Sequence, residues 1–237
     1  MQKIVLILLA ITVLMFMGCS NKEIRSYTPP AEVQFANSAV FNYPADKVKN
    51  AAIQYLKRQY SQVELVNLID NPASQSLVVY FLEPDPQKYI DCGVIQISLS
   101  SPSIYIPNGT HTFNAAQQRN EHPMLEPGST HVTLAVRTTQ LKGKVTLAFT
   151  EESKNSTYCT VTIQYTMPVR VEYPGLVKVF DIGIYGRVEY VQRVNNALVT
   201  FNTGETGTLN DGSETICVTK YILEKSIIDG IKAELTI

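Results

Sequence analysis

Cysteine and histidine are the residue types through which this 237-residue chain could do covalent or metal chemistry. Its three histidines, His111, His122 and His131, fall within or beside one segment, residues 101–130, and their separations match no recognised zinc spacing. The sequence contains no G-x-S-x-G or H-E-x-x-H motif, no phosphate-binding glycine loop and no dinucleotide fingerprint. We therefore expect a non-catalytic protein without metal or cofactor. A hydrolase would have to rest on Glu121, His122 and a nearby hydroxyl.

Cys19 stands directly after an apolar run. Residues 4–17 are apolar except for Thr12, and they follow a positive charge at Lys3. The run is shorter than the roughly 20 residues that a helix needs to cross a bilayer, and it fits the hydrophobic core of a secretory signal peptide. A buried N-terminal helix would need polar positions at helical spacing, and this run is apolar on every side. Residues 1–18 therefore predict a signal peptide.

The end of this segment, Phe16-Met17-Gly18-Cys19, resembles the lipobox of bacterial lipoprotein precursors. It matches that motif at Gly18 and Cys19 and departs from it at Phe16 and Met17. The resemblance implies cleavage before Cys19, acylation of its sulfur and its new amine with fatty acids such as palmitate, and anchoring in a membrane. Burial of acyl chains contributes about 0.8 kcal/mol per CH₂. Ser20 in place of aspartate implies the outer membrane of a two-membraned bacterium, with the protein facing the periplasm.

Residues 19–36 predict the lipidated cysteine followed by a flexible tether. They are mostly polar, include Pro29-Pro30 and show no hydrophobic periodicity. Residues 37–237 have the length of a single domain that can bury a sizeable core. The formal net charge of −1 gives no basic excess, so nucleic acid is not an expected partner.

Apolar residues recur at helical spacing near both ends of the folded domain. The apolar positions of the first helix, expected from about residue 45 to residue 60, are Val48, Ala51, Ala52, Tyr55 and Leu56. Leu223, Ile227 and Ile231 form a second stripe, with Thr219 available as its N-cap. The sequence thus predicts an N-terminal amphipathic helix and a C-terminal helix.

Between these helices the hydrophobic period is two, which predicts antiparallel strands. We place hairpin turns at the Lys-Gly pair 142–143 and the Asn-Asn pair 195–196, and a long loop with a short internal helix at residues 101–130. A curved antiparallel sheet with helices over one face makes an α+β domain. This order of elements resembles helix-grip domains, in which a sheet wraps a C-terminal helix. The resemblance implies an apolar cavity.

Three cysteines remain once Cys19 is acylated, and an envelope compartment would oxidise them. Cys159 is in phase with the apolar side of its strand, which favours a buried thiol. Cys92 and Cys217 are our expected disulfide, pinning the C-terminal helix to the sheet, although three single pairings are open on sequence. A redox role would need a C-x-x-C pair, and the chain has none.

Two functional hypotheses follow. In the first, the chain is an envelope lipoprotein that acts as an accessory or docking component of a membrane assembly, through the segment 101–130 or a tyrosine-bearing sheet face. The stretches "YIDCG" and "CVTKYILEKSII" resemble uncharacterised bacterial lipoproteins, a likeness that implies no particular function. In the alternative, the domain carries or senses a lipid or another apolar ligand, which requires an unfilled cavity.

Overall fold

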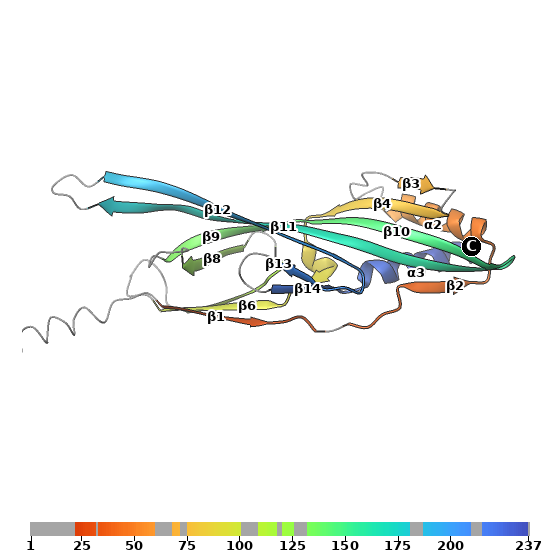
Figure 1. Cartoon of the computed structure of the whole chain (residues 1–237), viewed down its shortest axis with the longest axis horizontal. Coiled ribbons are helices and arrows are strands. Elements are labelled where there is room, and N and C mark those ends of the chain that lie inside the picture. The colour runs from red at the N-terminus through yellow and green to blue at the C-terminus, as the bar shows by residue number, and fades with distance from the viewer. Residues whose placement is uncertain are drawn as a thin grey trace, which may run out of the picture.

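The computed structural model describes residues 22–31, 33–59, 68–71, 75–100, 109–117, 120–125, 132–180, 187–209 and 215–236. This part of the chain is α+β, with mostly antiparallel strands and two helices (Figure 1). The expected signal peptide and Cys19 lie outside the described residues. Neither of the two described helices has the length and the apolar character that crossing a bilayer requires.

The described residues contain an eight-stranded antiparallel sheet organised around one long strand, β11. Its order is β3-β4-β10-β11-β9-β8, and β12 and β2 pair with the opposite edge of β11. The strands are β2 Ser38–Phe41, β3 Leu68–Asn71, β4 Ser76–Glu83, β8 Asn120–Leu125, β9 Val132–Thr139, β10 Leu141–Ser153, β11 Ser156–Phe180 and β12 Arg187–Asn202. Strand β11 therefore connects nearly all parts of this sheet.

The expected hairpin at residues 142–143 is wrong. Strands β9 and β10 run end to end along one edge of β11, because Thr139 pairs with Val169 and Lys142 pairs with Thr166. The chain passes from one strand to the next without reversing. The turn that reverses it lies at residues 154–155, between β10 and β11.

Gly143 makes room for a neighbouring aromatic ring and does not form a turn. It lies within β10, paired with Phe81 of β4 on one side and Tyr165 of β11 on the other. A Cβ at Gly143 would lie 1.9 Å from Cε1 of Phe81, so the aromatic ring occupies the space that a side chain would take. The Phe81 ring meets Tyr165 edge to face, at a centroid distance of 6.5 Å. A local turn signal was thus outweighed by a cross-strand contact.

The expected hairpin at residues 195–196 is also wrong. Both asparagines lie inside β12, where Asn195 pairs with Val171 and Asn196 with Arg170. Their side chains are exposed, so the ladder tolerates two poor strand formers without burying a polar group. The connection between β11 and β12 falls at residues 181–186, outside the described part of the chain.

Two helices cover one face of the sheet, which we call the inner face. Helix α2 spans Ala45–Gln59, and helix α3 spans Ile222–Leu235. Helix α2 buries the five residues expected from its periodicity, and α3 buries its expected stripe of Leu223, Ile227 and Ile231. The helices approach closely, because the Tyr55 ring would lie 2.1 Å from a Cβ at Gly230. Helix side chains therefore cover the part of the inner face that β2, β10 and β11 form.

Two three-stranded sheets accompany the main one, in the orders β1-β6-β7 and β13-β14-β5. Their strands are β1 Lys22–Thr28, β5 Ile90–Asp91, β6 Val94–Ser100, β7 Gly109–Asn114, β13 Gly207–Leu209 and β14 Thr215–Thr219. The flexible tether expected at 19–36 therefore contains a strand, because β1 pairs with β6 along its whole length. The loop expected at 101–130 contains β7 and β8, and its short helix is replaced by strand ends and a turn.

Candidate functional site

The structure places Cys92 and Cys217 at disulfide distance, with their sulfurs 2.03 Å apart. Both are fully buried, and the bond joins the residue after β5 to β14, directly before α3. Cys159 is a free, buried thiol. Burial raises its pKa to about 12, so it stays protonated and is a poor nucleophile. The fourth cysteine, Cys19, lies outside the described residues.

Tyr27 fastens strand β1 to this disulfide. Its Oη accepts a hydrogen bond from the N–H of Ile216 at 2.9 Å and lies 3.1 Å from the carbonyl oxygen of Cys92. Burial raises the pKa of Tyr27, and the charge of Asp91 adds to the rise while the hydrogen bond with Ile216 opposes it. The neutral phenol thus connects the N-terminal strand to both sides of the disulfide.

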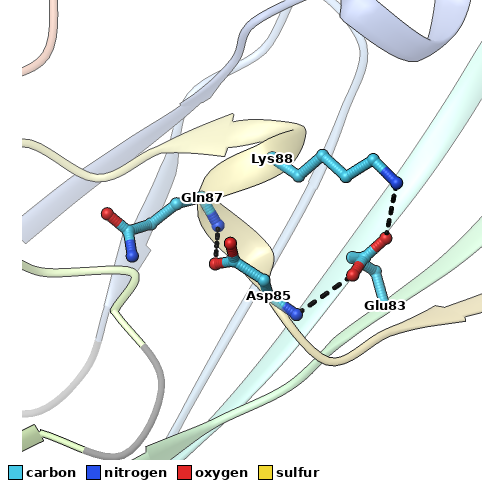
Figure 2. Close-up of polar contacts among 4 residues, drawn as sticks. All are labelled: Glu83, Asp85, Gln87 and Lys88. Carbon is cyan, nitrogen blue, oxygen red and sulfur yellow. Dashed lines mark hydrogen bonds and ion pairs between the residues drawn. The ribbon is translucent and has the colours of Figure 1, made fainter.

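A polar cluster holds the connection between β4 and β5 (Figure 2). Glu83 accepts hydrogen bonds from the N–H of Asp85 at 3.1 Å and from Nζ of Lys88 at 3.2 Å. Asp85 caps the short 3₁₀ helix η1, Pro86–Lys88, by accepting from the N–H of Gln87 at 3.2 Å. Hydrogen bonding with Tyr89, and then with Glu83, raises the pKa of Lys88, while desolvation opposes the rise. These groups fix a turn that leads to Cys92.

Glu224 is a buried carboxyl that sequence reasoning missed. Its Oε1 lies 3.1 Å from the hydroxyl of Tyr165, 2.8 Å from that of Thr203 and 3.2 Å from that of Thr219. Thr219 therefore lies in β14 and is not the N-cap of α3, a position that Tyr221 takes without a side-chain bond. The cluster ties α3 to three strands or turns. Glu224 itself is fully buried.

The exposed side of the main sheet, which we call the outer face, carries an open groove of about 670 Å³. It crosses the central strands β4, β10 and β11. The residues lining it are Tyr80, Phe81, Leu82, Gln140, Lys142, Gly143, Lys144, Gln164 and Thr166. This volume falls within the range of roughly 300–1,000 Å³ that is typical of small-molecule sites. The groove is therefore our candidate functional site.

The cross-strand register sets the geometry of the groove. One row across the outer face contains Tyr80, Lys144 and Gln164, which are neighbours on β4, β10 and β11. The next row contains Leu82, Lys142 and Thr166 in the same order. Each row thus places a lysine between an apolar or aromatic side chain and a neutral polar one. The chemistry that this arrangement supports is binding of an anion with an apolar part.

The sequence carried a signal for this site. Two lysines separated by one residue project from the same face of a strand, and this spacing is visible in the sequence. Apolar side chains on the neighbouring strand then complete the lining of the groove. The assignment of residues 142–143 to a turn hid that pattern, because it separated Lys142 from Lys144.

The histidines do not assemble into a centre in the described residues. His111 lies on β7 in one sheet and His122 on β8 in another, and His131 falls outside the described ranges. No group of three metal-ligating side chains occurs where the chain is described.

The fold and the groove define an α+β domain with helices on one face of its main sheet and an open groove on the other. No family model, curated protein or solved structure matches the chain.

Proposed function

We propose that the chain is a non-catalytic envelope lipoprotein, anchored by lipid on Cys19 in the outer membrane and facing the periplasm, which docks onto a membrane assembly. The anchor is supported by the apolar segment 4–17 and by Gly18-Cys19 at its end. An oxidising compartment agrees with the sulfur positions of Cys92 and Cys217. A carrier with an enclosed cavity is the weaker hypothesis, because α2 and α3 pack on β2, β10 and β11 and the buried side chains of the described residues form one core cluster.

The observation that carries the docking role is the outer edge of β12. In the described residues no strand pairs with this edge. Thr203, which follows β12, donates its N–H to the carbonyl of Ile163 at 2.9 Å, and every second residue of an antiparallel strand points its N–H the same way. The N–H groups of Val194, Asn196 and Leu198 therefore point away from β11, along the outer edge of β12.

The hairpin of β11 and β12 also projects beyond the rest of the sheet. Figure 1 shows it extending past β8 and β9. Strand β9 pairs with β11 at Val169–Glu172, whereas β12 pairs with it as far as Phe180. A two-stranded ribbon is only marginally stable in water, so a third strand would stabilise this one.

The occupant that fits this edge is an extended segment of a partner protein, added as a strand. Main-chain hydrogen bonds supply affinity in this mode, and alternate side chains supply specificity. Two exposed apolar side chains, Leu198 at 52% exposure and Val194 at 37%, are available for such side-chain contacts. A long unprotected edge of this kind is otherwise a liability for aggregation.

Asn196→Pro tests the docking role. Its ring removes an outward N–H and leaves the hydrogen bonds to β11 intact, since proline is tolerated at such an edge position. Purified from its own membrane in mild detergent, the lipidated wild-type protein should retain a stoichiometric protein partner in native mass spectrometry, and Asn196→Pro should lose it. Asn196→Ala, the matched control, keeps the N–H and should retain the partner. Equal retention by both variants, or no protein partner on the wild type, would refute docking through β12.

Cys19→Ser tests the anchor. Serine cannot take a thioether-linked diacylglycerol, so the variant should accumulate in soluble or unprocessed pools, whereas the wild type fractionates with the outer membrane. Fractionation followed by intact-mass measurement reads out both location and acylation. Normal processing and unchanged membrane fractionation of Cys19→Ser would overturn the lipid anchor.

A further inference from the structure

We propose that the groove on the outer face binds a small amphiphilic anion, with a carboxylate or phosphate group held by Lys142 and Lys144 and an apolar body lying along Tyr80 and Leu82. This ligand site goes beyond the docking role, and it lies on a different surface from the outer edge of β12.

The charge component comes from two exposed ammonium groups on one strand. Lys142 and Lys144 are two residues apart on β10, so they project from the same face, with their Cα atoms about 6.6 Å apart. Neither makes an ion pair with a described residue, and no acidic side chain is among the described residues that line the groove. The groove is therefore locally cationic in a chain whose formal net charge is −1. Electrostatic complementarity selects an anion.

The apolar component comes from β4. Tyr80 pairs with Lys144 and Leu82 with Lys142, and both β4 side chains are only partly buried. The methylene stems of the lysines extend this apolar surface while their charged ends stay in water. Gln164 and Thr166 on β11 close the other side with neutral polar groups. A purely ionic ligand would leave the Tyr80 and Leu82 surface uncovered, which is why the ligand we infer is amphiphilic.

Position in the sheet separates this pair of lysines from an ordinary solvated surface. Lysines are common on edge strands, where they discourage pairing with other chains. Strand β10 is not an edge, because it pairs with β4 on one side and β11 on the other. Protection against aggregation therefore does not explain two lysines at this place. Both lysines instead line the groove of about 670 Å³, together with side chains of β4 and β11.

The test is isothermal titration calorimetry, in which octanoate or octyl phosphate is titrated into the lipidated full chain in dodecyl maltoside. We expect at least one of these anions to bind in a 1:1 ratio, about tenfold more tightly than its four-carbon homologue, since longer chains bury more apolar surface. Octyltrimethylammonium, which has the same tail and the opposite charge, should not bind. The heat of ligand partition into the micelles is the same for every variant, and it is subtracted with a titration into detergent alone. The preference between the two anions tells a carboxylate ligand from a phosphate ligand.

The variant Lys142→Gln/Lys144→Gln should bind the anion about tenfold or more weakly than the wild type does. Lys57→Gln/Lys154→Gln removes the same charge from two exposed lysines on α2 and on the turn between β10 and β11, and should bind as the wild type does. Equal binding by both double variants, binding of octyltrimethylammonium, or no binding of either anion would overturn the proposal. Asn196→Pro should bind the anion normally, so failure of the docking role and failure of this site are distinguishable.

Discussion

Replacing Cys92 and Cys217 together with alanine is expected to lower the free energy of unfolding by about 2–5 kcal/mol. The disulfide closes a loop between residues that are 125 positions apart, so it restricts the unfolded chain strongly. Alanine is preferred to serine because both sites are fully buried, and a hydroxyl there would lack a partner. Thermal unfolding should show a drop in Tm of about 5–15 °C for a chain of this size.

Two controls isolate the disulfide from the packing of its sulfurs. Wild-type protein unfolded in excess reductant should resemble the double alanine variant. Cys159→Ala removes a buried thiol that forms no disulfide and should cost about 1 kcal/mol, the scale expected for a small core truncation. If reductant left the wild-type transition unchanged, the bond between Cys92 and Cys217 would not be contributing to stability.

Gly143→Ala is expected to destabilise the protein by about 3 kcal/mol, although glycine to alanine in a strand usually stabilises by reducing the entropy of the unfolded chain. The reason is the Phe81 ring, whose Cε1 would lie 1.9 Å from the new Cβ. Phe81 is buried against Tyr165, so the ring cannot move away without disturbing the core. Urea unfolding of the two proteins gives the difference directly.

Gly109→Ala is the matched control for this prediction. The nearest atom to a Cβ at Gly109 is Nε2 of His111, 3.9 Å away, so the substitution has room and should be neutral or slightly stabilising. Replacing the ring with the smaller side chain of leucine, in the double variant Phe81→Leu/Gly143→Ala, should recover part of the stability that Gly143→Ala loses. A double-mutant cycle measures this effect as the coupling energy between the two residues. A Gly143→Ala protein as stable as the wild type would show that the ring does not occupy this space.

Periodicity in the sequence was sufficient for the helices and for the burial of single positions. Val48 and Leu56 in α2, and Ile227 in α3, are buried where the apolar stripes predicted them. Cys159 is buried where alternation along its strand predicted it. These features depend on the spacing of side chains along one element, which the linear sequence records completely.

Turns and pairings could not be read in the same way. The Lys-Gly pair 142–143 and the Asn-Asn pair 195–196 are common turn sequences, yet both lie inside long strands because tertiary contacts outweigh local preference. The segments 19–36 and 101–130 lacked a strong pattern, and strands β1 and β7 form there by pairing with β6. Strand formation at such places depends on a partner that is distant in the chain.

The sequence alone determined an α+β class, two helices and the apolar phase of the strands, because each follows from local periodicity. Only the tertiary structure decided which cysteines meet, where Glu224 is buried and that Lys142 and Lys144 share a groove with Tyr80. The physical reason is that these contacts join residues brought together by strand register. Register is set by the packing of the whole sheet and is not encoded in any one segment.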